Sequence, residues 1–426
     1  MKQIAALIVF SALLIGCATR PDLSPEKAGI LAVKPSDLAT DRPLWNAAQA
    51  AAFKADFLTR RYSVWAETYE HNATQIGWPW TSYTFGKGYG ANRLPLNEAW
   101  FNDLALNAQI ETYPNRDALG LSLRAVDLRN FPTEEPFFKD FNKAGEGYPF
   151  DYLQNSRLHA QHPVRITHQS ARGDWIFVES DHAHGWVRPH EIAPIGPAEA
   201  SYLSSLPLAA IVREKTAVYN LQNRFLFDAD IGALLPITAQ GDPVVVTGGK
   251  IITAQADPAA LKPWPIEPTD RNLAELADRT LGRFYGWGGL EGGRDCSSLM
   301  RDLYAPIGRF LPRNSNQQAK AGEERLFAST KAPDRLAQIR AEALPFATLI
   351  NFPGHVGLYL GEQNGEGLLL HAAWGHRVLR GDYEDRLIIG QTAVTTLRAG
   401  SGLDEMRPNG LIDRAVSMTL IDKELP

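Results

Sequence analysis

The stretch Tyr285–Ser298, with the sequence YGWGGLEGGRDCSS, places the strongest constraint on how this chain can fold. Five glycines crowd its first nine residues, and a cysteine, Cys296, follows them. Beyond the cysteine, apolar residues recur at the spacing of one helix face, at Leu299, Met300, Leu303 and Tyr304. The pattern predicts a tight loop that leads into a helix starting near Cys296, with one face buried in a core.

Cys296 can be interpreted in two ways. It can be a small buried side chain on the core stripe of the helix. It can also be a nucleophile, because a thiol in the first turn of a helix lies near the positive end of the helix dipole. That position lowers the pKa of the thiol and favours the thiolate. The position alone favours the buried residue, so the choice depends on the rest of the chain.

The N-terminus resembles that of an exported lipoprotein. Lys2 precedes an apolar run, Ile4–Ile15, which is short for a membrane span but fits a signal-peptide core. The run ends in Leu14-Ile15-Gly16-Cys17, which resembles the lipobox of bacterial lipoproteins. The resemblance implies a signal peptide over 1–16, lipid on Cys17 and a tether over 17–43. Ala18 then favours the outer membrane, and an ordinary secretory signal is the alternative.

The cysteine count makes Cys296 conspicuous. The chain has two cysteines, and lipidation of Cys17 leaves Cys296 as the one free thiol of an exported protein. It cannot form an internal disulfide and is open to oxidation, which favours a functional use. The net charge of -5 argues against a nucleic-acid partner.

The remaining chain predicts a multidomain α+β protein, because 426 residues suffice for about three domains. Its expected parts, in order, are a mainly helical or irregular segment over 44–117, SH3-like β domains over 118–200 and 205–256, a proline-rich linker over 257–270, and an α+β domain over 271–426. Short strands broken by glycine turns indicate the two small barrels. His182, His184 and His190 fall in a turn region, where exposed polar residues are expected rather than a metal site.

Two histidines occupy a predicted hairpin in the last domain. Residues 355–360 alternate as in a strand, residues 361–365 (GEQNG) read as a turn, and 368–371 as the returning strand. With Gln363 at the centre of the turn, His355 and His371 lie directly opposite one another, with Cβ atoms about 5 Å apart. Gly357, on the same face, leaves room for a helix or a substrate.

A cysteine, a histidine base and an orienting polar group are the parts of a thiol protease. In this interpretation His355 takes the proton of Cys296, and His371 fixes the tautomer of His355. Structural histidines at strand ends are one alternative. A Cys-His-His zinc site is another, although it lacks an obvious fourth ligand apart from His376. The pairing of the histidines favours catalysis, with no metal and no cofactor.

The motifs resemble those of the NlpC-type cell-wall cysteine peptidases, a papain-like family. The matching segments, in the order of the family, are YGWGG at 285–289, DCSSL at 295–299, GHVG at 354–357, and His371. The resemblance implies a papain-like α+β domain that cuts peptidoglycan stem peptides between D-glutamate and a diamino acid, either diaminopimelate or lysine. It assigns Cys296 as nucleophile, His355 as base and His371 as the orienting residue.

The same resemblance implies further roles and leaves choices open. Tyr285 lines the site and assists the oxyanion together with the Cys296 backbone N–H. Asp295 and Ser297 bind the free amine of L-alanine, although Asp295 can also cap the helix. Ser298 departs from the family, which usually has glycine there. A non-catalytic wall-binding lipoprotein and an acyl transferase are the alternative functions, and the oligomeric state stays open.

Overall fold

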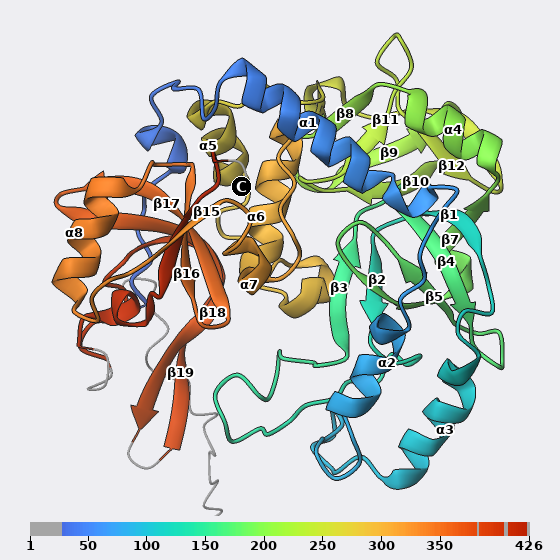
Figure 1. Cartoon of the computed structure of the whole chain (residues 1–426), viewed down its shortest axis with the longest axis horizontal. Helices are drawn as coiled ribbons and strands as arrows, with labels where there is room; N and C mark the ends of the chain where they lie inside the picture. The colour runs from blue at the N-terminus through green and yellow to red at the C-terminus, as the bar shows by residue number, and fades with distance from the viewer. Residues whose placement is uncertain (1–27, 381–382, 404–407, 424–426) are drawn as a thin grey trace, which may run out of the picture.

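The computed structural model describes residues 28–380, 383–403 and 408–423, without the side chains of 379, 380 and 383–385. A C-terminal α+β domain lies beside two β domains, and the N-terminal segment runs across both (Figure 1). The expected architecture, with two small β domains between N-terminal helices and a C-terminal α+β domain, is confirmed. The predicted signal peptide and Cys17 lie outside the described residues.

Residues 28–43 are packed against the C-terminal domain, so the predicted tether is wrong for this part. Asp270, the first residue of helix α5 (Asp270–Asp278), accepts hydrogen bonds from the backbone N–H groups of Thr40 and Arg42. Ser36 donates to Asp278 at the other end of the same helix. These polar anchors are far apart in the sequence, which is why composition alone suggested a free tether.

The N-terminal helices connect the domains. Helix α1 (Ala47–Arg61) starts at an Asn46 capping box and contributes Phe53 to the core of the C-terminal domain. Helices α2 (Ala73–Ser82) and α3 (Glu98–Ala108) pack on the first β domain, where Ile76 joins a cluster with Trp186.

The first β domain is a seven-stranded antiparallel sheet in the order β3-β2-β6-β5-β4-β1-β7. Its strands are β1 (Ala118–Ser122), β2 (Val126–Arg129), β3 (Gln154–Leu158), β4 (Pro163–Gln169), β5 (Ile176–Glu179), β6 (His184–Val187) and β7 (Ile192–Ile195). The expectation of exposed histidines is wrong for His182, whose side chain is 3% exposed. Its Nδ1–H donates to Asp181 Oδ1, which also contacts His162.

The second β domain follows helix α4 (Pro197–Ser205) and has a four-stranded and a three-stranded sheet. Its strands are β8 (Leu208–Ile211), β9 (Thr216–Asn220), β10 (Phe225–Ala229), β11 (Leu234–Pro236), β12 (Val244–Thr247), β13 (Lys250–Gln255) and β14 (Leu261–Pro263). Strand β14 pairs with β8. The predicted linker, 257–270, is therefore partly a strand of this domain.

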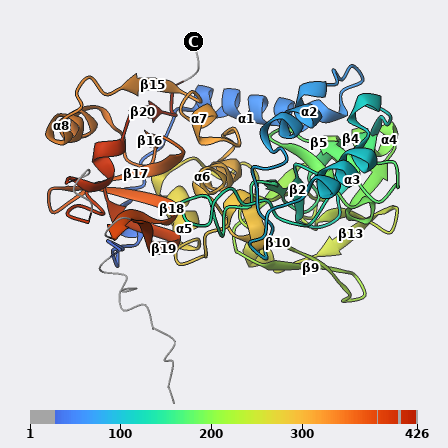
Figure 2. The ribbon, with the colours of Figure 1, turned by 90° about the horizontal axis from the view of Figure 1, so that it is seen from below.

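The C-terminal domain is built on a six-stranded antiparallel sheet in the order β15-β20-β16-β17-β18-β19. Its strands are β15 (Glu323–Leu326), β16 (Thr348–Phe352), β17 (His355–Gln363), β18 (Glu366–Arg380), β19 (Tyr383–Thr396) and β20 (Ser417–Leu420). Helix α6 (Cys296–Tyr304) lies between this sheet and the β domains in both views (Figures 1 and 2). Helices α7 (Ser315–Gln318) and α8 (Ala332–Glu342) complete the domain.

The histidine hairpin forms, but the predicted register is wrong by two residues. Leu358 pairs with Leu370 and Tyr359 with Leu369, which puts Gly357 opposite His371. The turn consists of Asn364 and Gly365, and a bulge lies before it in β17, between Tyr359 and Gly361. A Cβ on Gly357 would come within 2.7 Å of Leu369 Cγ, so the neighbouring strand fills the space expected for a helix or substrate.

Candidate active site

The glycine-rich loop is shaped by its contact with the first β domain. Gly288 and Gly289 have φ angles of 61° and 88°, which favour glycine. A Cβ on Gly288 would lie 2.6 Å from the Gln154 carbonyl oxygen, and one on Gly289 would lie 2.5 Å from Arg157 Cβ. Gln154 Nε2 donates to the Gly288 carbonyl at 3.1 Å. Strand β3 therefore supports the loop that leads to Cys296.

Cys296 is the first residue of helix α6, as the sequence predicted. Asp295 is the N-cap and its carboxylate accepts from the Ser298 backbone N–H at 2.9 Å. Ser298 Oγ in turn accepts from the Asp295 backbone N–H at 3.0 Å, so the serine in the place of the family's glycine completes a capping box. Cys296 itself is 8% exposed.

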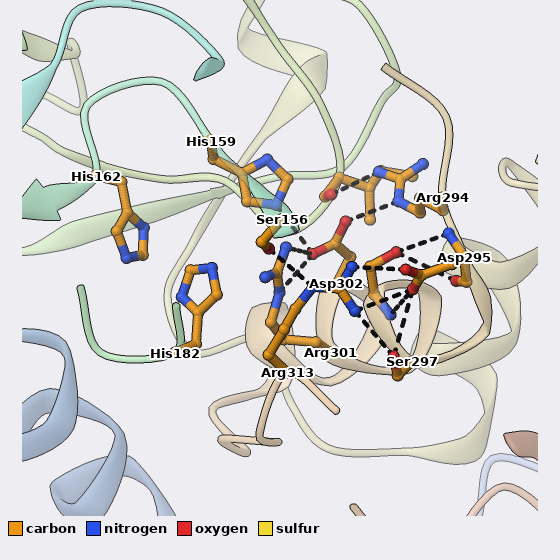
Figure 3. Close-up of polar contacts among 12 residues, drawn as sticks. Ser156, His159, His162, His182, Arg294, Asp295, Ser297, Arg301, Asp302 and Arg313 are labelled. Carbon is orange, nitrogen blue, oxygen red and sulfur yellow. Dashed lines mark hydrogen bonds and ion pairs between the residues drawn. The ribbon is translucent and has the colours of Figure 1, made fainter. Parts of the chain in front are cut away.

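Asp295 is ion-paired inside the protein. Arg313 donates to both of its carboxylate oxygens, at 3.1 and 2.6 Å, and the Gly288 N–H adds a bond at 3.1 Å (Figure 3). Arg313 also donates to Ser297 Oγ at 2.9 Å. An incoming ammonium would have to compete with this guanidinium for the carboxylate. The sequence analysis missed Arg313, although it sits in the polar Pro312-Arg313-Asn314 segment.

The two histidines form a hydrogen-bonded row that ends at a threonine. His355 Nε2 lies 2.8 Å from His371 Nδ1, and His371 Nε2 lies 3.1 Å from Thr395 Oγ1. Each neutral imidazole carries one N–H. If His355 donates to His371, and His371 to Thr395, then His355 Nδ1 is left as an acceptor. If instead Thr395 donates to His371, and His371 to His355, then the proton of His355 is on Nδ1 and His355 cannot accept a proton from the thiol.

The expected site residues border one cavity of about 580 Å³. They are Tyr285, Asp295, Cys296, Ser297, His355 and His371. The other walls come from the N-terminal segment, the first β domain and the C-terminal domain. Trp78 and Tyr83 belong to the N-terminal segment, and Phe150 and Tyr152 to the first β domain. Trp374 of β18 faces Tyr285, with ring centroids 6.1 Å apart. No pattern in the sequence could have predicted that Phe150 and Tyr152 of the first β domain line this cavity.

The resting charges of the site differ from the expectation. Burial raises the pKa of the Cys296 thiol to about 12, and the Asp295 carboxylate adds to the rise. Burial lowers the pKa of His355 to about 3, and the positive charge of Arg414 adds to that fall. The predicted lowering of the thiol pKa by the helix dipole is therefore wrong, because desolvation and a neighbouring anion outweigh the dipole. Both groups are neutral at neutral pH.

Asp295 and Tyr285 respond to the same surroundings. Burial alone would raise the pKa of Asp295, but Arg313 and the Ser298 N–H outweigh it and hold that pKa below its usual value. Burial, with help from the Asp295 charge, raises the pKa of Tyr285 well above its usual value. Tyr285 therefore keeps its proton and can act as a hydrogen-bond donor.

A buried polar network ties helix α6 to both β domains. Asp302 lies 3.0 Å from His159 Nε2 of the first β domain and accepts from Arg301 and, at 2.7 Å, from Arg294 (Figure 3). Arg294 also donates to Glu214 of the second β domain at 2.8 Å. The side chains of Arg294, Arg301, Asp302 and Glu214 are at most 10% exposed and that of His159 is 16% exposed, so this largely buried network fixes how the domains meet behind the cavity.

Among the described residues, potential metal ligands gather at His162, Asp181 and His182 rather than around Cys296. Both imidazoles contact the same oxygen, Asp181 Oδ1, at 2.8 and 2.5 Å. Ligands of a tetrahedral zinc ion stand about 3.3 Å apart, because each is about 2 Å from the metal. The separations of 2.8 and 2.5 Å are shorter than this and are those of hydrogen bonds, so the three side chains are not arranged as zinc ligands.

The described part of the chain contains no helix with the length and apolar character needed to span a membrane.

Comparisons with known proteins identify the domains. Residues 282–393 match the NlpC/P60 family, 136–188 an SH3 domain of SH3b1 type, and 197–241 an SH3 domain of SH3b2 type. Residues 6–113 match the N-terminal NLPC_P60 stabilising domain. The chain carries two SH3b-type domains, followed along the sequence by an NlpC/P60 peptidase domain. The stabilising domain includes α1, α2 and α3, the helices that wrap the other parts.

Individual relatives agree with this assignment. A γ-D-glutamyl-L-lysine dipeptidyl-peptidase of Bacillus subtilis is 26% identical over 194 residues, which are 44% of this chain and 59% of that protein. A probable endopeptidase of Corynebacterium glutamicum is 28% identical over 120 residues, 28% of this chain and 50% of that protein. The chain thus matches about half the length of these relatives.

A solved structure supports the fold of the whole chain. The NlpC/P60 endopeptidase from Photobacterium damselae subsp. piscicida superposes with a TM-score of 0.83 and 24% identity, over 93% of this chain and 98% of that one. The common fold therefore extends over the N-terminal helices, both SH3b-type domains and the NlpC/P60 domain.

Proposed function

We propose that this protein is a cysteine endopeptidase that hydrolyses the γ-D-glutamyl-L-diamino-acid bond of peptidoglycan stem peptides. The observation that carries the proposal is the row from His355 through His371 to Thr395, whose two histidines line the same cavity as the helix-start thiol of Cys296. The NlpC/P60 match and the dipeptidyl-peptidase relative support the same reaction class.

The first half-reaction forms a thioester. His355 Nδ1 takes the proton from Cys296 Sγ as the sulfur attacks the γ-carbonyl carbon of D-glutamate. The oxyanion accepts hydrogen bonds from the Cys296 backbone N–H at the helix start and from the Tyr285 hydroxyl, which keeps its proton at neutral pH. His355 then donates its proton to the leaving amine of the diamino acid, and the acyl-enzyme remains.

The second half-reaction releases the acid. His355, neutral again, takes a proton from water as the water attacks the thioester, and then returns that proton to the sulfur. In both halves the imidazolium of His355 is a transient species, because burial disfavours its charge. His371 accepts from His355 Nε2–H and stabilises that transient charge.

The rest of the chain bears on where the reaction takes place and on which substrates reach the cavity. We propose that lipid on Cys17 anchors the enzyme in the bacterial cell envelope, at the periplasmic face of the outer membrane. The first SH3b-type domain forms a wall of the cavity through Phe150 and Tyr152, and so restricts which part of a stem peptide can reach the thiol. Peptidoglycan turnover or recycling is the proposed role.

The test compares hydrolysis of L-Ala-γ-D-Glu-diaminopimelate by the wild-type chain and by Cys296→Ala. We expect the variant to lose activity while its unfolding transition stays close to that of the wild type, because alanine keeps the small apolar side chain at the core stripe. Iodoacetamide should inactivate the wild type slowly, because the resting thiol is buried and protonated, and chelators should not inactivate it. Cleavage by Cys296→Ala at the wild-type rate would overturn the proposal.

A further inference from the structure

Arg313 is a buried cation that joins the start of helix α6 to the first β domain. Its side chain is 7% exposed, and it donates to both carboxylate oxygens of Asp295, at 3.1 and 2.6 Å. It also donates to Ser297 Oγ at 2.9 Å, and its Nε donates to Ser156 Oγ of strand β3 at 2.8 Å (Figure 3). These four bonds hold the guanidinium in one orientation against the residues on either side of Cys296.

The ion pair with Arg313 matters because the charge of Asp295 is unfavourable for the neighbouring thiol. Burial is the main cause of the raised pKa of Cys296; the Asp295 carboxylate adds to the rise, and the Arg313 charge opposes it. Burial also disfavours the charge of Arg313, but the carboxylate outweighs burial and keeps the pKa of Arg313 above its usual value. The pair therefore caps the helix without leaving a net negative charge beside the sulfur.

The proposed reaction places negative charge on the sulfur in both of its halves. The charge develops when the Cys296 proton moves to His355, and again when the thioester breaks. A like charge nearby disfavours such an ion, whereas an opposite charge favours it. A guanidinium that is already fixed on the carboxylate cancels the repulsion without moving during the reaction.

We propose that Arg313 is a positioning residue for the catalytic thiol. It neutralises Asp295 and holds Ser297, so that the start of helix α6 can stabilise negative charge on the Cys296 sulfur. Because Ser156 helps to orient Arg313, the first β domain contributes to the surroundings of the thiol as well as to the cavity wall. This inference rests on the proposed function, because it takes Cys296 as the nucleophile.

The first measurement is the rate at which iodoacetamide alkylates Cys296 without substrate, followed by mass spectrometry of the peptide that contains this residue. At about pH 9 a thiol with a pKa of about 12 is mostly protonated, so the rate is proportional to its thiolate fraction. Asp295 stays ionised at this pH even without Arg313, because the backbone N–H groups of Gly288 and Ser298 still donate to it.

The variants separate the charge of Arg313 from its shape. Arg313→Met should slow the alkylation by roughly 10-fold to 100-fold, because the sulfur then faces an uncompensated carboxylate. Arg313→Lys keeps a charge but not the planar fork, so its rate should lie between those of Arg313→Met and the wild type. The double variant Asp295→Asn/Arg313→Met loses both charges and should react at least as fast as the wild type. As a control, Arg165→Met removes a buried arginine that pairs with Asp117 and does not line the cavity, and its rate should stay within about 3-fold of the wild type.

The direction of the change distinguishes this role from a purely structural one. If Arg313 only supported the fold, its loss would loosen the helix start and expose the thiol, and alkylation would become faster. Faster alkylation of Arg313→Met, or a double variant as slow as the single one, would therefore overturn the proposal. If Arg313→Met does not fold, Arg313→Lys gives the same test, and a rate above that of the wild type would overturn the proposal.

Turnover of L-Ala-γ-D-Glu-diaminopimelate provides the second measurement. We expect Arg313→Met to lower kcat by roughly 10-fold or more without raising KM, because the guanidinium acts on the thiol and not on the substrate. A higher KM with an unchanged kcat would make Arg313 a substrate-binding residue and overturn the assignment. A wild type that cleaves no peptide would instead reject the peptidase proposal, while the alkylation rates would still test the effect of Arg313 on the thiol.

Discussion

Replacing Thr395 with valine tests the row of hydrogen bonds behind the base. Thr395 is fully buried and His371 is 1% exposed, so water cannot replace the lost hydroxyl. Valine keeps the shape and removes the group that lies 3.1 Å from His371 Nε2. Leaving a buried donor without an acceptor costs about 1–3 kcal/mol, and about 1.4 kcal/mol corresponds to a factor of ten.

That free energy should appear mainly in kcat. His371 can avoid the penalty by moving its proton to Nδ1, where it donates to His355. The proton of His355 is then forced onto Nδ1, which removes the acceptor that Cys296 needs. We therefore expect kcat to fall by about 5-fold to 150-fold with little change in KM. The change of tautomer spares the folded state the cost of an unsatisfied buried donor, but it leaves His355 without its acceptor. The loss in free energy of unfolding should therefore be smaller than the rise in activation free energy.

The assay measures kcat and KM on the diaminopimelate tripeptide, together with urea unfolding. Thr395→Ser keeps the hydroxyl and should retain activity near that of the wild type. Thr392→Val replaces another buried threonine of β19 and controls for an added methyl group. The reasoning is refuted if Thr395→Val destabilises the protein but leaves kcat unchanged, or if the serine variant is as inactive as the valine variant.

Three further predictions concern the support of the site. Gly289→Ala should lower stability and activity more than Gly292→Ala, measured by thermal unfolding and turnover, because both have positive φ but only Gly289 would clash with the first β domain; equal effects would contradict this. Asp302→Asn should lower the free energy of unfolding by about 3–5 kcal/mol in urea, since it breaks buried ion pairs, and a loss below about 1 kcal/mol would count against the network. Burial lowers the pKa of His182 to about 3 and of His184 to about 4, so the unfolded chain binds more protons below about pH 6.5. Stability should be full above that pH and fall toward pH 4, and a flat profile of unfolding free energy would refute it.

The helix at Cys296 is predictable from the sequence because its signals are local. An apolar stripe, a capping aspartate and a terminating glycine all lie within one short segment. The hairpin is predictable for the same reason, since Asn364 and Gly365 mark its turn. The predicted register is wrong because it centres the turn on Gln363, whereas the turn at Asn364 and Gly365 pairs Gln363 with Glu366. The bulge between Tyr359 and Gly361 then shifts the pairing by one residue, which the alternation of side chains does not reveal.

The features that the sequence does not reveal depend on long-range contacts. The partner of Asp295, Arg313, is 18 residues away, and the wall of Phe150 and Tyr152 comes from another domain. The charge state of Cys296 depends on burial by all of these elements together. A rule that considers only the helix dipole therefore gives the wrong direction for the pKa of the thiol.

The neutral thiol has a consequence if the chain is exported, as we propose. A thiolate is the form that oxidants attack, and exposure makes it more susceptible. Cys296 is 8% exposed and its pKa is raised to about 12, so the resting enzyme holds little thiolate. The proton must instead move to His355 during the attack on the substrate. The same burial that delays ionisation thus protects the thiol from oxidants, and in the proposed mechanism the row to Thr395 makes the delayed proton transfer possible.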